Sequence, residues 1–188
     1  MNIIGKRVFL RAMEADDMEL YREMANDPET ERLLGGWSFP IAPCEQEAWY
    51  QKAVTDKKNL RFTVVARETG EAVGMVNLVD LDWKNGSAFQ GIRLAASGRG
   101  KGYGMDAVMS LMRYAFEELR LHRLNSSIIQ YNFRSQKMYE RCGWKIEGKK
   151  EQAVFRNGRY WDLLITGILR ADYERAKIEL GYGGAEQV

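Results

Sequence analysis

Apolar residues recur along the chain at two spacings, and these spacings predict an alternation of strands and helices. Short apolar or alternating runs rich in β-branched and aromatic residues are typical of strands. Such runs cover residues 8–12, 61–66, 72–83, 88–94, 122–130, 144–155 and 160–169. Apolar positions at steps of three and four, or a proline followed by acidic residues, predict helices. Those segments are 18–26, 43–56, 105–119 and 134–141.

Turn residues indicate how these elements connect. Residues 68–71, Asn85-Gly86 and Asn157-Gly158 each separate two strand-like runs and predict hairpins. The helix over 105–119 joins two strands, so strand 122–130 is expected to lie parallel to strand 88–94. The chain is therefore expected to be α/β (α+β), with a mixed sheet of about seven strands flanked by helices.

Length and composition indicate one globular domain. The chain has 188 residues, 45% of them hydrophobic, and shows no repeat or linker. We expect the domain to span residues 1–170, with residues 171–188 forming a C-terminal helical extension that frays at its end. The net charge of +2 argues against a generic nucleic-acid or membrane-surface binder. The N-terminus does not read as a signal peptide, so the expected location is the cytoplasm.

Cysteine and histidine usage gives no sign of a metal site or a disulfide. Cys44 and Cys142 are far apart and no C-x-x-C pair occurs. The single histidine, His122, follows the helix over 105–119, where a C-terminal cap is the expected role.

A glycine-rich loop precedes the helix over 105–119 and carries the first chemical signal. Glycines alternate with larger residues from Gly98 to Gly104, and Arg99 and Lys101 lie among them. A loop of this kind offers free N–H groups and the positive end of the helix dipole to a phosphate. The dinucleotide fingerprint fails here because Tyr103 or Met105 replaces its last glycine, and no G-K-[ST] triplet occurs.

The spacing that does fit is [RQ]-x-x-G-x-[GA], read as Arg99, Gly102 and Gly104. It resembles the acetyl-coenzyme A loop of the GNAT acetyltransferase superfamily. The segment Asn132–Trp144 is similar to the N-x-x-[SA]-x-x-x-Y-x-x-x-G-[FW] segment of the same family, and the order of elements matches from about Arg7 to Leu169. The branch it resembles contains ribosomal-protein N-terminal (alanine) acetyltransferases and spermidine acetyltransferases. The resemblance implies a GNAT-like, mainly antiparallel sheet with one splayed parallel pair at the cofactor site.

The resemblance also assigns acetyl-coenzyme A as cofactor and a set of residues to hold it. The loop residues would grip the pyrophosphate, strand 88–94 would lend backbone groups to the pantetheine, and two residues after strand 122–130 would contact the same arm. These residues are Ile92, Arg93, Leu94, Arg99, Gly100, Lys101, Gly102, Tyr103, Gly104, Asn132 and Ser135. The last two also suit capping of the helix over 134–141.

Tyr139 matches the family's tyrosine that protonates the departing thiolate. A phenol with a pKa of roughly 10 can donate to a thiolate whose basicity resembles that of cysteine, roughly 8.5. The alternative role for Tyr139 is packing at the edge of the core.

One departure from the family concerns the base. Many relatives carry a glutamate where this chain has Ala88. Asp80, Asp82 and Glu31 are the candidates to stand in for it. The acceptor pocket is expected where the two N-terminal helices and the last hairpin converge, walled by aromatic residues. The candidate aromatic residues are Trp37, Phe39, Trp83, Tyr131 and Trp161.

The expected activity is therefore transfer of an acetyl group to a primary amine. A protein or peptide N-terminus and a small amine, such as a polyamine or an antibiotic, both stay open as acceptors. The missing base favours an α-amino acceptor, because an α-amino group is substantially neutral near pH 7.5. The alternative class is a non-catalytic acyl-coenzyme A-binding module, and a homodimer is a candidate assembly.

Overall fold

A single sheet of eight strands organises the chain in the computed structural model, which describes residues 2–35 and 39–183. The spatial order is β1-β2-β3-β4-β5-β6-β8-β7. The strands are β1 (Ile3–Ile4), β2 (Val8–Ala12), β3 (Leu60–Ala66), β4 (Ala72–Asp82), β5 (Ser87–Leu94), β6 (Arg123–Ile129), β7 (Lys145–Arg156) and β8 (Arg159–Leu169). The helices are α1 (Met18–Asn26), α2 (Pro28–Leu33), α3 (Pro43–Ala53), α4 (Tyr103–Arg113), α5 (Phe133–Arg141) and α6 (Arg170–Glu179).

Neighbouring strands are antiparallel except for one pair, which confirms the mixed sheet. β5 and β6 run parallel and pair only over Ser87–Phe89 with Arg123–Asn125. Beyond these three residue pairs β5 stays bonded to β4 and β6 to β8, while the two strands separate from each other. The expected splayed parallel pair is thus present, and the eighth strand is the short β1, which the apolar pattern did not predict.

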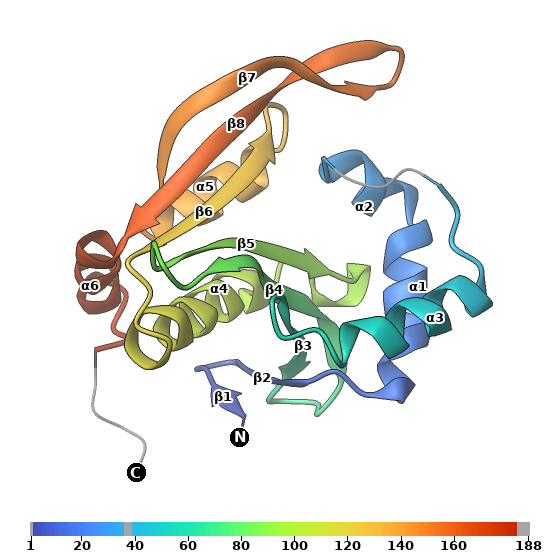
Figure 1. Ribbon diagram of the computed structural model, residues 1–188, viewed down its shortest axis with the longest axis horizontal. Coiled ribbons are helices and arrows are strands. Elements are labelled where there is room, and N and C mark those ends of the chain that lie inside the picture. Colours follow the sequence, from blue (N-terminus) through green and yellow to red (C-terminus); the bar gives the residue numbers. More distant parts are fainter. Residues whose placement is uncertain (1, 36–38, 184–188) are drawn as a thin grey trace.

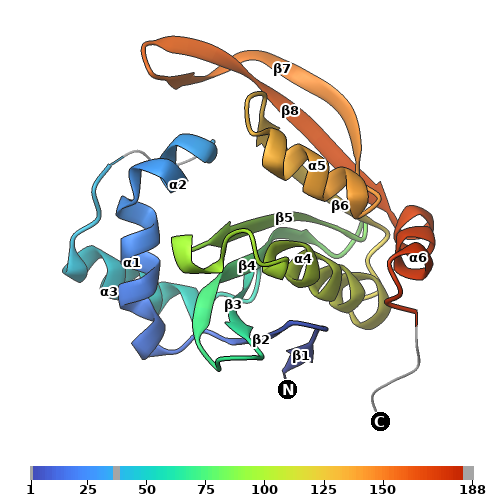
Figure 2. The same cartoon turned by 180° about the vertical axis from the view of Figure 1, so that it is seen from behind.

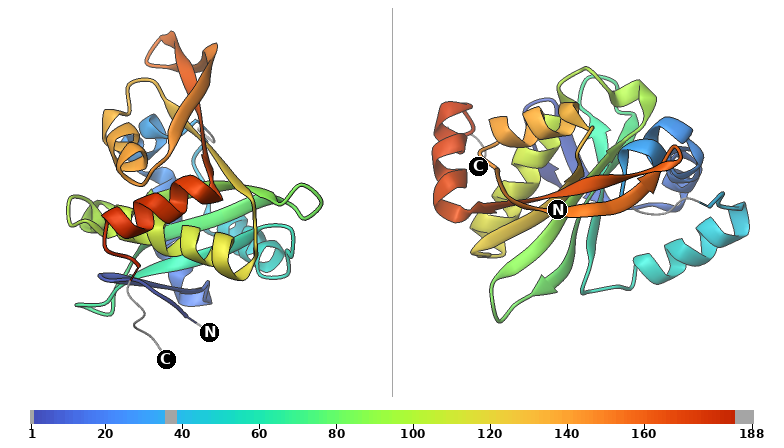
Figure 3. Two further views of the ribbon diagram at one scale, coloured as in Figure 1. Left: turned by 90° about the vertical axis from the view of Figure 1, so that its left-hand side faces the viewer. Right: turned by 90° about the horizontal axis from the view of Figure 1, so that it is seen from above.

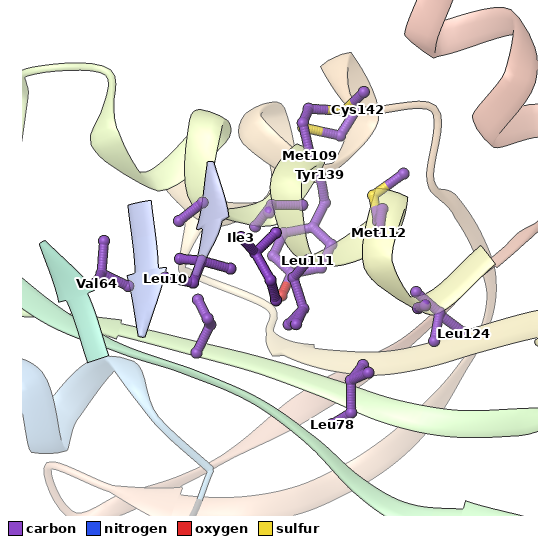
Figure 4. Packing of buried hydrophobic residues seen from close by; sticks show 14 of the residues in the cluster. Ile3, Leu10, Val64, Leu78, Met109, Leu111, Met112, Leu124, Tyr139 and Cys142 are labelled. Carbon is purple, nitrogen blue, oxygen red and sulfur yellow. The ribbon is translucent and has the colours of Figure 1, made fainter. Parts of the chain in front are cut away.

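Two apolar clusters pack the helices against opposite faces of the sheet. The larger cluster joins α4 to β2–β6, with Met109 and Leu111 fully buried between them (Figure 4). The smaller one joins α1 and α3 through Met18, Tyr21 and Met24. Figure 1 shows α1, α2 and α3 together at one end of the molecule, coloured blue to cyan. The predicted helix over 105–119 is α4 continued by a turn of π-helix over Tyr114–Glu118.

The helix α2 was not among the predicted helices. Proline disfavours helical geometry in the residue before it, so α1 ends at Asn26 as predicted. The side chain of Asp27 then accepts hydrogen bonds from the N–H groups of Glu29 and Thr30 and caps a new helix with Pro28 at its first position. The helix has six residues.

The hairpin of β7 and β8 projects away from strands β1–β5 (Figure 3), and its tip lies over α2 (Figures 1 and 2). Asn157 and Gly158 turn it with φ values of 52° and 77°, which suits the predicted Asn-Gly turn. Next to the turn, the guanidinium of Arg156 bonds Glu31 at 3.0 Å and donates to the Leu34 carbonyl at 3.1 Å. The hairpin therefore closes over the C-terminal end of α2.

The C-terminal segment belongs to the packed body at least as far as Tyr182. Tyr173 on α6 is fully buried and stacks on Phe116, and its hydroxyl donates to Glu117. Tyr182 donates its hydroxyl hydrogen to Asp106. No helix of the described residues is long and apolar enough to cross a membrane.

The carboxylate of Asp106 ties the first turn of α4 to both ends of the chain. It is 2% exposed and accepts hydrogen bonds from the backbone N–H groups of Lys6, Arg7 and Val8 at 2.7–3.0 Å, and from Tyr182 at 2.7 Å. Four donors converge on one side chain, so α4 and the glycine loop before it are fixed relative to β2.

We expect Asp106→Ala to lower the free energy of unfolding by about 3 kcal/mol, because it leaves several buried donors without an acceptor. Urea unfolding followed by circular dichroism measures this loss. The exposed acid Asp16 provides the control, since Asp16→Ala is expected to leave the midpoint within experimental error. Equal midpoints for the two variants would contradict the anchoring role of Asp106.

Candidate active site

The end of β5 that no longer pairs with β6 forms one side of a cleft of about 290 Å³. The glycine loop and the first turn of α4 form its floor, and α5 and the end of α2 form its other walls. Ten of its lining residues decide its chemistry: Ile92, Arg93, Leu94, Arg99, Gly100, Gly102, Gly104, Asn132, Arg134 and Ser135. Nine of these are residues that the sequence assigned to the cofactor; Arg134 was not foreseen. Lys101 and Tyr103 belong to the same loop but do not line the cleft, and Tyr103 is buried in the core.

The N-terminus of α4 presents backbone donors to this cleft. Gly102 is the N-cap residue, with φ of 80°, and no side chain caps the helix. A side chain at this φ would be strained. At Gly104 a Cβ would lie 3.1 Å from the Met138 sulfur, so glycine lets α4 and α5 approach each other. The first N–H groups of the helix and its positive dipole end are thus left for an anion.

Arg99 lines the cleft, but its charge is already engaged by α2. Its guanidinium bonds Asp27 at 2.9 Å, Glu29 at 2.7 Å and the Thr30 hydroxyl at 2.5 Å. The hydrogen bond from Thr30, followed by that from Arg99, lowers the pKa of Asp27 to about 2, so this partner stays ionised at neutral pH. Because two carboxylates face one guanidinium, Arg99 fixes α2 to the loop and adds little positive potential of its own.

Lys101 and Arg134 are two cations near this cleft that could bind a phosphate. Lys101 is exposed, Arg134 is exposed on the first turn of α5, and neither forms an ion pair within the described part of the chain. Sequence reasoning passed over Arg134, although it lies between Asn132 and Ser135 of the second motif. Together with the uncapped helix and the unpaired edge of β5, these side chains fit a long, phosphorylated ligand such as coenzyme A.

The two polar residues at the start of α5 hold the rim of the cleft. The Asn132 side chain accepts from the Ser135 N–H at 3.2 Å, capping α5, and donates to the Leu33 carbonyl at 3.3 Å. The capping role expected for Asn132 is present, and its second contact joins α5 to α2.

Tyr139 lies beneath the opening and not on the cleft surface. It is 4% exposed, packs in the larger cluster near Met109 (Figure 4), and meets Trp144 edge-to-face at 4.9 Å. Burial raises the pKa of its phenol to about 12, against a smaller lowering by the neighbouring Ser126 and Gln90. Gln90 and Ser126 directly follow the last paired residues of β5 and β6. The phenol therefore lies at the point where the two strands separate.

A second cleft of about 480 Å³ lies on the other face of β4 and β5, under α1, α2 and α3. Its floor contains Met75, Asn77 and Arg93, and its walls include Tyr21 and Trp49. It shares Thr30, Leu34 and Arg93 with the first cleft, so the two meet at Arg93.

Of the candidate acceptor residues, Glu31 lines this second cleft, where it pairs with Arg156. Asp80 and Asp82 do not line it; they lie at the end of β4, where Asp82 accepts from the N–H and amide of Asn85. These two hydrogen bonds, chiefly that from the Asn85 backbone, lower the pKa of Asp82. Trp37 lies outside the described residues.

The other predicted aromatic residues are not in the wall of this cleft. Phe39 and Trp83 are 70% and 61% exposed. Tyr131 and Trp161 stack edge-to-face at 4.6 Å beside α2. The aromatic residues that do line this cleft are Tyr21 and Trp49. The sequence did not identify them, because they lie in helices whose apolar pattern predicted only core packing.

Comparison with known proteins identifies the family. Residues 7–145 match the model of the Acetyltransferase (GNAT) domain, and the chain belongs to this family of N-acetyltransferases. It is 28% identical over 172 residues to the spermidine N(1)-acetyltransferase of Vibrio cholerae, covering 90% of this chain and 97% of that one. It is also 28% identical to the putative ribosomal N-acetyltransferase YdaF of Bacillus subtilis, over 93% of this chain and 97% of that one.

The fold comparison agrees. The structure of the Vibrio cholerae spermidine N-acetyltransferase, solved with CoA and spermine, superposes with a TM-score of 0.84 at 26% identity. The match covers 90% of this chain and 99% of that chain. Both the expected GNAT fold and the expected use of acetyl-coenzyme A are thereby confirmed.

Cations at the cofactor cleft that form no ion pair with a described residue are expected to act on coenzyme A binding, whereas the ion-paired Arg99 is expected to act on stability. We expect Lys101→Gln and Arg134→Gln each to raise the Kd for coenzyme A by roughly 3- to 10-fold, since each removes one charge from a phosphate site. We expect Arg99→Gln to lower the unfolding temperature of the ligand-free protein, because it releases α2. Calorimetric titration and thermal unfolding measure the two effects.

Lys84, exposed in the turn between β4 and β5, is the matched control for these charges. Lys84→Gln is expected to change neither quantity. An Arg99→Gln variant that unfolds at the normal temperature and only loses coenzyme A affinity would contradict the assignment of Arg99 to α2.

Proposed function

We propose that the protein transfers an acetyl group from acetyl-coenzyme A directly to a primary amine bound in the second cleft, with Tyr139 as general acid. The observation that carries this proposal is the meeting of the two clefts at β5, next to the place where β5 and β6 separate. A ligand in the first cleft and an amine in the second can thus meet without leaving the protein.

Acetyl-coenzyme A supplies the acetyl group as a thioester and leaves as a thiol. In the transfer an N–C bond forms and the C–S bond breaks. The Tyr139 hydroxyl gives its proton to the sulfur, and its phenolate takes up the proton that the amine nitrogen loses. A pKa of about 12 keeps this phenol protonated throughout the neutral range, as an acid must be before transfer. The same burial that raises the phenol's pKa also raises that of a thiol beside it, which keeps the two matched.

The second cleft holds no carboxylate that is free to act as base within the described residues. Glu31 is bonded to Arg156, and the exposed Glu45 accepts from the Ala42 N–H as part of the α3 cap. Ala88, at the position of the family's glutamate, is 1% exposed in the core. The acceptor is therefore expected to arrive as a neutral amine, which an α-amino group with a pKa of about 8 does readily.

A polyamine is the second candidate acceptor, since similar proteins are named spermidine N-acetyltransferases. Recognition of a polycation calls for a group of uncompensated carboxylates. In the described part of the second cleft both carboxylates already have partners, so this candidate is weaker.

We expect Tyr139→Phe to lower kcat by roughly 100-fold or more, because a positioned general acid contributes about 10²–10⁴-fold. The KM for acetyl-coenzyme A should stay nearly constant, since the proton is needed only as the thiolate departs and not in the ground-state complex. Thiol release with a panel of amines and peptide N-termini measures both constants.

The matched control is Tyr114→Phe, in the π-helical turn beyond α4, where the ring packs edge-to-face on Phe62. This variant should keep full activity. Coenzyme A binding without acetylation of any amine, or indifference of kcat to Tyr139→Phe, would instead favour a non-catalytic acyl-coenzyme A-binding module.

A further inference from the structure

Arg93 is a cation that faces the second cleft without an acidic partner. It lies on β5 opposite Met75 of β4, at the junction of the two clefts. Its side chain forms no hydrogen bond or ion pair within residues 2–35 and 39–183. Burial lowers the pKa of its guanidinium, and no neighbouring carboxylate opposes this lowering.

Each other charged group that lines the second cleft among the described residues is either ion-paired or lies at the exposed rim. Arg61 bonds Asp56 at 3.3 Å, and Glu31 bonds Arg156 at 3.0 Å. Glu45 lies at the exposed rim and accepts from the Ala42 N–H at 2.9 Å. Since these charges are balanced or lie at the rim, Arg93 leaves an unbalanced positive charge on the floor of the cleft.

A partly desolvated guanidinium without a partner costs free energy, which a bound anion recovers. The planar guanidinium matches a carboxylate through two parallel hydrogen bonds. We propose that Arg93 binds a carboxylate of the acceptor, so that the acceptors are amino acids or related small amines with a carboxylate a few bonds from the amine. This inference rests on the amine acetylation proposed above and names its substrate class.

The same charge disfavours polyamines. Each unreacted nitrogen of a polyamine is a cation at neutral pH, with a pKa near 10. Such a molecule would bring a second positive charge to Arg93 in a cleft whose acids are engaged. Like charges at short range in a partly desolvated site repel strongly. Because of Arg93, this chain is expected to prefer carboxylate-bearing acceptors over the polyamines that a polyamine acetyltransferase would use.

The test compares acceptors that differ in one group. The pairs are alanine with alaninamide and β-alanine with its amide, and spermidine serves as the polycation. kcat/KM is measured from the release of the coenzyme A thiol. Because the acceptors differ in amine pKa, each value is divided by the fraction of neutral amine, which pH profiles provide. We expect each carboxylate to be preferred over its amide by roughly tenfold or more, the size of a charge-assisted bidentate contact.

Arg93→Met should abolish this preference, with kcat/KM falling for the carboxylate acceptors and much less for their amides. Arg93→Lys retains the charge but not the two parallel N–H donors of the guanidinium, and should retain part of the preference. Arg61→Met is the matched control, because Arg61 lines the same cleft but is paired with Asp56. It should leave the preference intact, and thermal unfolding of every variant checks folding.

Each of the following outcomes would overturn the inference. Arg93→Met and Arg93→Lys could both keep the wild-type preference, or could act only on the KM for acetyl-coenzyme A. The wild type could prefer spermidine or the amides. If the wild type acetylates no amine at all, the proposed acetyl transfer fails together with this inference. If the wild type acetylates amines but shows no preference for carboxylates, only this inference fails.

Discussion

The early separation of β5 from β6 is the constraint on which the site depends. Parallel strands in one sheet ordinarily pair along their length, yet these two share only three residue pairs. Each strand keeps its other neighbour, so the sheet stays intact while two backbone edges face each other unpaired. Buried backbone groups need partners, so these edges are suited to hydrogen bonding a ligand. The glycine loop, α5 and Tyr139 all border this one opening.

Where two strands separate, the elements around the opening need other contacts to fix their positions. In this structure α2 provides most of these contacts. Arg99 of the loop bonds the N-terminal end of α2. At the other end, Asn132 of α5 donates to the Leu33 carbonyl. Arg156 of the hairpin bonds Glu31 and donates to the Leu34 carbonyl. One short helix is therefore fixed by three elements that are distant in sequence. Its Thr30 also lines both clefts, so α2 forms part of the boundary between them.

The sequence predicted most of the elements, because strand and helix periods persist over enough residues to be recognised. It missed α2 and β1 for the same reason: six and two residues are too short to show a period. The splay and the cofactor loop followed from the resemblance. What no local pattern could show was which charges are compensated. The partner of Arg99 lies 72 positions away, and the choice between Asp27 and a phosphate is made only by the folded chain.

That distinction changes the meaning of the basic residues. From sequence, Arg99 was the anion-binding charge and Arg93 a donor of backbone groups. In the structure two carboxylates bond Arg99, whereas Arg93 has no carboxylate partner among the described residues. Electrostatic attraction depends on uncompensated charge and on desolvation more than on the number of basic residues. The phosphate end of the site then presents the α4 N-terminus, Lys101 and Arg134, whereas the guanidinium of Arg93, unpaired within the described part of the chain, lies where the two clefts meet.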